Sequence, residues 1–250
     1  MIKMIVGVSG GTASGKTTFA HAVMNSVADT GVEVDIMSVD MFYPELAEEV
    51  DKLNHNFDVP EALDVKLFIE KILELNSVGE SKIPHHDFAT TTVTHDHTHI
   101  DRPDVLIIEG MMLHTLLKRG PDLLSEEEIK SLGLTKQELT VILKRILKKS
   151  LNIFVGVDED AILCAQKRLE RRKIRDEEDR GVSPEDTEEM WKPIVREHFR
   201  HVEPQKEVCD EFVYENNFDN MIEKISKKIV STVKKRSVIK NTSTIKAPKK

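Results

Sequence analysis

A glycine-rich segment close to the N-terminus has the residue types and spacing of a phosphate-binding loop. Gly10 is followed by four residues and then by Gly-Lys-Thr at 15–17, and the segment lies between an apolar stretch and a helical pattern. Backbone N–H groups of such a loop surround phosphate oxygens, and the N-terminus of the next helix adds a favourable dipole. We expect Lys16 to bridge β- and γ-phosphates and the Thr17 hydroxyl to bind Mg²⁺. The predicted cofactor-binding residues here are Gly10, Gly11, Thr12, Ala13, Ser14, Gly15, Lys16, Thr17 and Thr18.

Three acidic residues follow predicted strands at the sheet edge that carries this loop. Asp40, Glu109 and Asp158 each fall at the carboxyl end of a predicted parallel strand, where ligands bind in open α/β sheets. Asp40 is the candidate for orienting or deprotonating an attacking hydroxyl. Glu109 follows four apolar residues and is expected to hold Mg²⁺ through water, together with Thr17. Each acid also fits a helix cap or solvated turn, and for Asp158 that interpretation is favoured.

Arginines gather in one later segment of the chain. Arg168, Arg172 and Arg175 are spaced four and three residues apart, so they share one face of a predicted helix, and Arg180 follows in a charged turn. Such a face is suited to close over a triphosphate, because guanidinium groups neutralise charge on transferring phosphoryl oxygens. The alternative is a solvated helix paired with the acids at 176–179. The catalytic candidates of the sequence are Asp40, Lys16 and Arg175.

Three alternating histidines raise the question of a metal site. On a strand, His95, His97 and His99 share one face, which is compatible with metal binding. No acid or thiolate at matching spacing completes a site, so a polar, exposed hairpin strand is the favoured interpretation.

Composition limits the class of protein. The 250 residues include 36 Lys and Arg against 44 Asp and Glu, a formal net charge of −8, so we expect no nucleic-acid partner bound through a general surface field. No stretch approaches the roughly 20 apolar residues of a membrane-spanning helix, and the N-terminus does not resemble a signal peptide, so no membrane partner is expected. Two cysteines are too few for a disulfide framework, which favours a reducing, cytoplasmic location.

Apolar stretches alternate with amphipathic patterns along the chain. Buried strands are predicted at residues 2–8, 32–40, 105–108, 151–157 and 211–214. Helices are predicted from residue 16 and at 60–75, 125–131, 135–149, 159–175, 184–199 and 218–233. This alternation indicates an α/β fold, a doubly wound parallel sheet of five strands with helices on both faces. We expect one domain over 1–234, with a hairpin lobe at 82–100, a helical insertion at 118–149, an arginine-rich lid at 172–184 and a basic flexible tail at 235–250.

Several segments together resemble the uridine kinases, or uridine-cytidine kinases, of the P-loop kinase superfamily. The matching segments are 10–18, Ser-Val-Asp-Met-Phe-Tyr at 38–43, Asn-Phe-Asp-Val-Pro-Glu-Ala-Leu-Asp at 56–64, 84–88, 106–110 and the arginine-containing segment 171–181. They span most of residues 1–215 and are jointly more specific than the phosphate loop alone.

The resemblance implies that the chain transfers the γ-phosphate of ATP or GTP, with Mg²⁺, to the 5′-hydroxyl of a ribonucleoside, uridine or cytidine, as in pyrimidine salvage. It implies that Asp40 is the base, that Asp58 and Arg172 hold the ribose hydroxyls, and that the sheet order is 2-3-1-4-5. The implied substrate-binding residues are Asp40, Tyr43, Asp58, His86, Phe88, Arg172 and Arg175, and Arg175 and Arg180 are implied to reach the phosphates.

Departures from the family pattern concern base recognition. His86 stands where the family has tyrosine, Thr91 replaces a histidine, Val182 an arginine, and Met190 a polar glutamine. A kinase for another hydroxylated metabolite, such as nicotinamide riboside or pantothenate, therefore remains an alternative, as does a non-catalytic nucleotide-binding protein. The oligomeric state, including a homo-oligomer, stays open.

Overall fold

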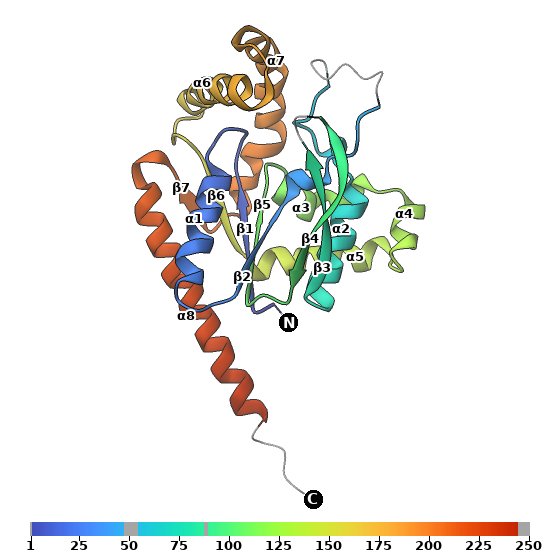
Figure 1. Ribbon diagram of the computed structural model, residues 1–250. Coiled ribbons are helices and arrows are strands. Elements are labelled where there is room, and N and C mark those ends of the chain that lie inside the picture. The colour runs from blue at the N-terminus through green and yellow to red at the C-terminus, as the bar shows by residue number, and fades with distance from the viewer. Residues whose placement is uncertain (1, 48–54, 88–89, 245–250) are drawn as a thin grey trace, which may run out of the picture.

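The computed structural model describes residues 2–47, 55–87 and 90–244 of the chain. At its centre lies a five-stranded sheet made of β1 (Met4–Ser9), β2 (Val34–Ser38), β5 (Val105–Glu109), β6 (Leu151–Val155) and β7 (Glu211–Val213) (Figure 1). Every neighbouring pair is parallel, and the spatial order is β2-β5-β1-β6-β7. Counted along the chain this is 2-3-1-4-5, which confirms the implied order and the α/β class.

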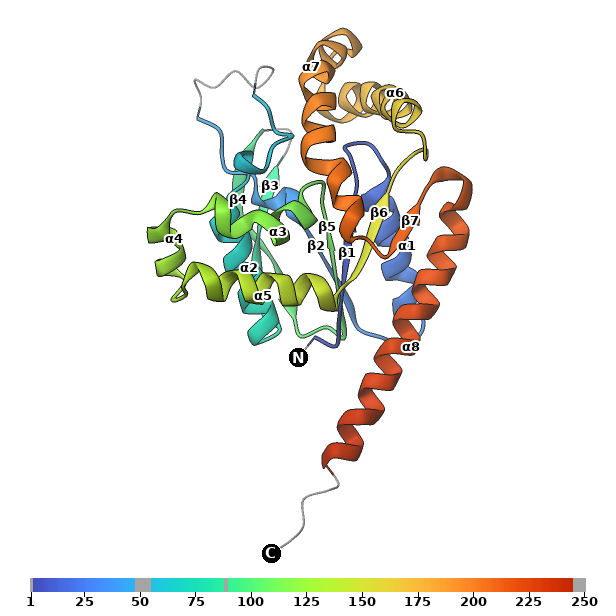
Figure 2. The ribbon, with the colours of Figure 1, turned by 180° about the vertical axis from the view of Figure 1, so that it is seen from behind.

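Helices cover both faces of this sheet. Because successive strand residues point to opposite faces, Ile107 packs in one core with α1 (Lys16–Ala28) and α8 (Phe218–Thr244). Its neighbour Leu106 packs in the other core. The helices of that second face are α2 (Val65–Ser77), α3 (Leu113–Leu123) and α5 (Lys136–Lys149). Figures 1 and 2 show the two layers from opposite sides, and the doubly wound arrangement is confirmed.

Strand register brings the ends of three strands level. Val8 of β1 and Ser38 of β2 both pair with Glu109 of β5. β2 was predicted to reach Asp40 but ends at Ser38, and Val39–Phe42 form a 3₁₀ turn. The turn begins there because the Ser38 hydroxyl accepts a hydrogen bond from the backbone N–H of Asp40 at 3.3 Å.

A separate antiparallel hairpin lies beside the main sheet. It consists of β3 (Glu80–Asp87) and β4 (Thr92–Asp101), with an irregular register between Pro84 and His85. Ile83 and Ile100 anchor it to the core that contains α2 and α3. The prediction of an extended hairpin around 82–100 is confirmed.

The helix predicted at 60–75 is divided into two pieces. Pro60–Ala62 form a 3₁₀ turn, Leu63 is extended, and α2 starts at Val65. The break follows from Asp64, whose side chain accepts the N–H of Leu67 at 2.8 Å and caps α2.

Helical structure extends further than predicted in three regions. The lid predicted at 172–184 is mostly helix, since α6 (Ala161–Arg180) runs through it before Gly181, at φ 65°, ends the helix and α7 (Pro184–Glu197) begins. The segment expected to be a helical insertion, 118–149, contains the second half of α3, which begins before it at Leu113, together with α4 (Glu126–Ser131) and α5. The segment expected to be a flexible tail, 235–250, continues α8 as far as Thr244, and residues 245–250 lie outside the described ranges. None of the helices in the described ranges combines the length and the apolar character that a membrane crossing needs.

Candidate active site

The glycine-rich segment forms a tight loop between β1 and α1. Gly10 and Gly15 have φ of 154° and 88°, in the region that favours glycine, and a Cβ on Gly10 would lie 2.2 Å from the carbonyl oxygen of Val155. Lys16 is 8% exposed, and Ser14 Oγ is buried with no hydrogen-bond partner among the described residues. An orphaned hydroxyl beside a lysine and a helix N-terminus fits a loop that receives an anion.

A hydroxyl and a buried carboxylate meet next to this loop. Thr17 Oγ1 donates a hydrogen bond to Glu109 Oε2 at 3.2 Å, and Glu109 is 2% exposed. Burial raises the pKa of Glu109, the charge of Lys16 opposes this rise, and Asp40 adds to it. This pair fits Mg²⁺, which binds one or two protein oxygens and completes its shell with phosphate and water. Within the described ranges there is no cluster of three or more His, Cys, Asp or Glu side chains able to hold a metal ion.

One cavity of ≈ 180 Å³ joins the loop to most of the other predicted site residues. The lining residues that the sequence predicted are Thr12, Lys16, Asp40, Tyr43, Asp58, His86, Arg172, Arg175 and Arg180. They come from the loop between β1 and α1, the turn after β2, the segment before Pro60–Ala62, the hairpin and α6. The fold thus collects residues that are 168 positions apart in the chain at their extremes. Asp40 and Lys16 therefore face the same cavity.

Asp158 stands apart from this cavity. Phe88 lies outside the residues that the structure describes. Asp158 forms an ion pair with Lys167 at 3.0 Å, and a hydrogen bond from Lys167 is the main cause of its lowered pKa. It is not among the lining residues, in agreement with its interpretation as a turn acid.

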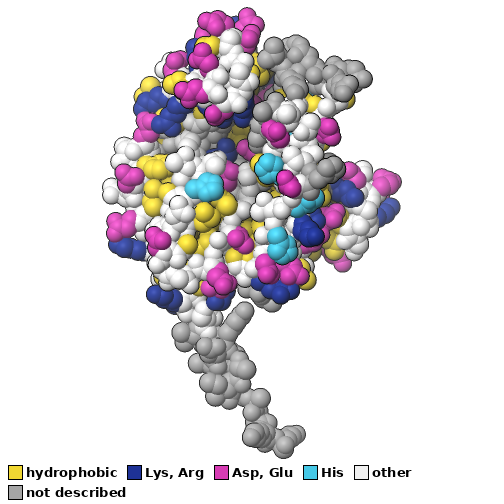
Figure 3. Space-filling view, in the orientation of Figure 1, with side chains coloured by type: hydrophobic (Ala, Val, Ile, Leu, Met, Phe, Trp, Pro, Cys, Tyr) yellow, Lys and Arg dark blue, Asp and Glu magenta, His cyan; other side chains and the backbone are white. Residues whose placement is uncertain are grey.

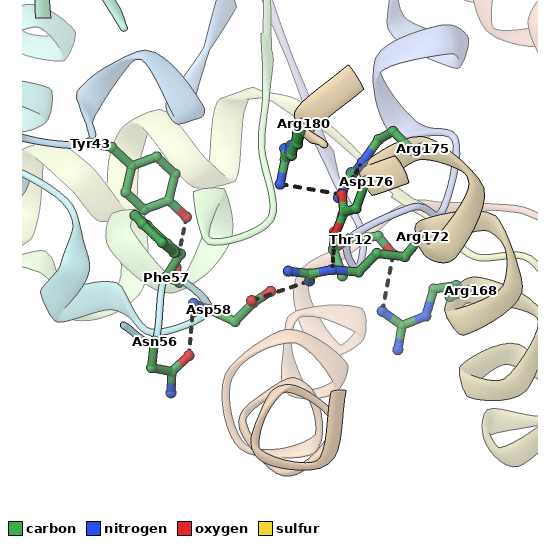
Figure 4. A network of polar contacts seen from close by, with 10 residues as sticks. All are labelled: Thr12, Tyr43, Asn56, Phe57, Asp58, Arg168, Arg172, Arg175, Asp176 and Arg180. Carbon is green, nitrogen blue, oxygen red and sulfur yellow. Dashed lines mark hydrogen bonds and ion pairs between the residues drawn. The ribbon is translucent and has the colours of Figure 1, made fainter. Parts of the chain in front are cut away.

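Asp176 is a site residue that sequence reasoning did not single out. It lies at the centre of the arginine network in Figure 4, where Arg172 Nε is 3.0 Å, Arg175 Nη2 2.7 Å and Arg180 Nη1 3.5 Å from its carboxylate. Burial raises its pKa, but the charges of Arg175 and Arg172 outweigh this, so the pKa of Asp176 is lowered. Its spacing of four residues from both Arg172 and Arg180 was the available signal.

A second carboxylate holds Arg172 from across the cavity. Asp58 Oδ2 lies 3.5 Å from Arg172 Nη1, and both side chains are buried. The backbone N–H of Asp58 donates to Asn56 Oδ1 at 3.0 Å, which sets the turn before the 3₁₀ segment. Arg172 is thus fixed between Asp58 and Asp176, with its guanidinium edge at the cavity.

Aromatic side chains form the opposite wall. Tyr43 packs edge-on against Phe57 at 5.6 Å and donates its hydroxyl to the Phe57 carbonyl at 2.8 Å. The ring of His86 lies 6.1 Å from that of Tyr43. His86 is 2% exposed, and burial is the main cause of its lowered pKa, so it is neutral at pH 7. Thr91, Val182 and Met190, the departures from the family pattern, line the same cavity.

Two of the three alternating histidines of β4, His97 and His99, are not among the residues that line this cavity, and the side chain of His95 lies outside what the structure describes. His97 and His99 are exposed on β4, and Figure 3 shows histidine side chains on the outer face of the hairpin among acidic neighbours. A polar exposed strand, the favoured interpretation of the sequence, agrees with this placement.

A parallel sheet with a phosphate loop after its first strand, and with acids on two neighbouring strands, defines the class of P-loop phosphotransferases. Residues 5–124 match the model of the phosphoribulokinase and uridine kinase family. The chain is 27% identical over 238 residues to a uridine kinase of Lactobacillus johnsonii, covering 92% of this chain and 97% of that protein. It is 26% identical over 239 residues to a uridine kinase of Clostridium novyi, covering 92% and 98%.

The fold is also similar to a crystal structure from Silicibacter sp. TM1040 described as a candidate fructose transport system kinase. The TM-score is 0.52 at 15% identity, covering 84% of this chain and 88% of that chain. The chain is thus similar to the phosphoribulokinase and uridine kinase family over residues 5–124, and to uridine kinases over most of its length. It is a phosphotransferase that acts on an alcohol group.

Proposed function

We propose that the protein transfers the γ-phosphate of ATP or GTP to the 5′-hydroxyl of a ribonucleoside, in the first place uridine or cytidine. The observation that carries this proposal is the single cavity shared by Lys16 of the phosphate loop and the carboxylate of Asp40. A kinase needs the donor phosphate and the acceptor hydroxyl side by side, and catalysis then depends on positioning and charge neutralisation. The names of the relatives support a nucleoside as acceptor.

The donor is held by the loop and its neighbours. Backbone N–H groups and Lys16 bind the phosphates, while Thr17 and Glu109 hold Mg²⁺. When bound, Mg²⁺ neutralises charge on the donor phosphates. Arg175 and Arg180 lie on the other side of the cavity and are proposed to reach the same phosphates.

The acceptor is held by the remaining lining residues. Asp40 accepts the proton of the attacking hydroxyl, and the Asp58–Arg172 pair binds the ribose hydroxyls. Tyr43 and neutral His86 contact the base.

The test is ADP formation with Mg²⁺ over a panel of uridine, cytidine, adenosine, nicotinamide riboside and pantothenate, with ATP or GTP as donor. We expect uridine or cytidine to give the highest kcat/KM. We expect Asp40→Asn to lower kcat about 10²–10⁴-fold, while Asp158→Asn, an acid outside the cavity, keeps parental kcat. Parental turnover in Asp40→Asn would remove Asp40 from the role of base.

A second candidate is a kinase for another hydroxylated metabolite. It is favoured by Thr91, Val182 and Met190, which place uncharged side chains in the cavity wall. A higher kcat/KM for a panel member other than uridine or cytidine would select it. Nucleotide binding with no acceptor phosphorylated would instead identify a non-catalytic nucleotide-binding protein. A cytoplasmic location is supported by Cys164 and Cys209, which are both free thiols.

A further inference from the structure

Arg168 is a buried cation without a matching anion. Its side chain is 1% exposed; Nη1 lies 3.4 Å from the Thr12 carbonyl oxygen, and Nε and Nη2 have no hydrogen-bond partner in the described part of the chain. Arg171, Arg172 and Arg175 on the same helix each form an ion pair with a carboxylate. Arg168 forms no ion pair with any residue that the structure describes.

This guanidinium is pressed against the phosphate loop. A Cβ on Gly11 would lie 1.9 Å from Arg168 Nη1, so a larger residue at this position would have to displace the guanidinium. On its other side the guanidinium lies 5.3 Å from the ring of Trp191 on α7. Figure 4 shows Arg168 reaching Thr12 separately from the three arginines around Asp176. Arg168 shares a helix face with Arg172 and Arg175, but its contacts differ from theirs, so we assign it a different role.

A buried charge without a partner is costly, and an anion bound close by would offset that cost. We propose that Arg168 is a positioning residue of the donor site: it supports the loop at Gly11 and Thr12, and its charge is compensated when a polyphosphate fills the loop. The proposal rests on the donor half of the proposed function. Burial lowers the pKa of Arg168, and the Cys164 thiol and the more distant charges of Asp58 and Glu203 only partly oppose this, which fits a poorly compensated cation.

The fluorescence of Trp191 reports on its contact with Arg168. It is the single tryptophan of the chain, so all tryptophan emission comes from the ring beside Arg168. An anion in the loop changes the field at the guanidinium, and we expect the emission of Trp191 to change with it. The same contact links occupancy of the loop to the packing of α6 against α7.

The experiment measures binding of inorganic tripolyphosphate and of uridine by calorimetry to the full chain and its variants. We expect Arg168→Met to bind tripolyphosphate about tenfold or more weakly, with Arg168→Lys intermediate and uridine affinity unchanged in both. The matched control is Lys173→Met on α6, which removes a cation paired at the surface with Glu188 and keeps both affinities. In the parent and in Lys173→Met, tripolyphosphate shifts Trp191 emission, whereas in Arg168→Met the shift is lost.

Thermal unfolding separates this role from a structural one. Replacing an uncompensated buried charge by an apolar side chain of similar length does not lower Tm, so the free Arg168→Met protein should melt at or above the parental Tm. Parental tripolyphosphate affinity in Arg168→Met overturns the proposal. So does an equal loss of tripolyphosphate and uridine binding with a lowered Tm. If Arg168→Met does not fold, Arg168→Lys carries the same criteria. A parent that binds tripolyphosphate but phosphorylates no acceptor refutes the proposed function and leaves this inference intact.

Discussion

The chemistry of the site depends on how charges are balanced around a few side chains. Lys16, Glu109 and Asp40 influence one another closely enough for both Lys16 and Asp40 to change the pKa of Glu109. Asp176 gathers three arginines, and Asp58 provides a second anchor for Arg172. Positive charge is thereby concentrated over the phosphate loop in a chain whose net charge is −8. The local arrangement of ion pairs, and not the net charge, therefore determines which ligand charge this site attracts.

The substitution Asp176→Asn tests the ion pairs between Asp176 and the three arginines. The amide keeps the size of the side chain but removes the charge that holds Arg172, Arg175 and Arg180. We expect kcat/KM for the nucleoside to fall about tenfold or more, and the free energy of unfolding to fall by about 3 kcal/mol. Steady-state kinetics and urea unfolding measure the two effects. Asp179→Asn, an exposed acid on the same helix, is the control, and equal effects in both variants would refute a special role for Asp176.

Short turns, more than the regular elements, place the candidate catalytic groups. Asp40 faces the cavity because the Ser38 hydroxyl starts a 3₁₀ turn after β2. Asp58 faces it because Asn56 and the turn at Pro60–Ala62 redirect the chain before α2. Gly181 ends α6 directly after Arg180, which fixes where the last arginine of the network lies. Each turn uses one side chain to satisfy a backbone group, so each is sensitive to a single substitution.

A further prediction concerns Asp64, a capping residue that lies outside the cavity. Its side chain accepts the N–H of Leu67 and caps α2, which packs in the core below the site. We expect Asp64→Ala to lower the free energy of unfolding by about 1 kcal/mol, whereas Asp64→Asn retains most of the stability. Because α2 lines no part of the cavity in the described ranges, kcat should be unchanged in both. A loss of kcat larger than the loss of folded protein would contradict this separation.

The molecule as a whole buries several histidines that have no role in the proposed reaction. His114, on α3, is 1% exposed; its Nδ1 lies 2.9 Å from Ser9 Oγ, and its Nε2 is close to Gly7 of β1. It therefore joins the second helical layer to the central strand that leads into the phosphate loop. Burial is the main cause that lowers the pKa of His114, to about 4. The packing of α3 on the sheet therefore depends on a neutral imidazole.

This burial predicts a loss of stability in acid. The folded protein binds the His114 proton only near pH 4, whereas the unfolded chain binds it near 6.5, so stability is complete above 6.5 and falls as the pH is lowered towards 4. The two pKa values correspond to ~3 kcal/mol. Urea unfolding between about pH 7 and pH 4.5 should show a shallower pH slope in His114→Gln than in the parent. His99→Gln, an exposed histidine of β4, should keep the parental slope, and a parental slope in His114→Gln would refute the assignment.

Most of the architecture could be predicted before any coordinates. The five strands follow from short apolar runs such as Val105–Glu109, which is buried throughout, and the phosphate loop follows from glycine and lysine spacing. Boundaries were predicted less well where one side chain stops an element, as Asp64 does at α2 and Ser38 after β2. Continuation of α8 to Thr244 was also missed, because a basic, polar segment has no apolar period to indicate a helix.

By itself the sequence determined the α/β class, the loop that binds phosphate and the types of side chain available at the sheet edge, because these depend on local spacing and periodicity. Only the tertiary structure decided which of the arginines face the cavity, since Arg168 and Arg172 share a helix face but enter different surroundings. It also decided that Asp176 is central and that Asp158 is not. Which charged side chains form ion pairs depends on distances across the fold. Local sequence patterns do not encode these distances when the residues are far apart in the chain.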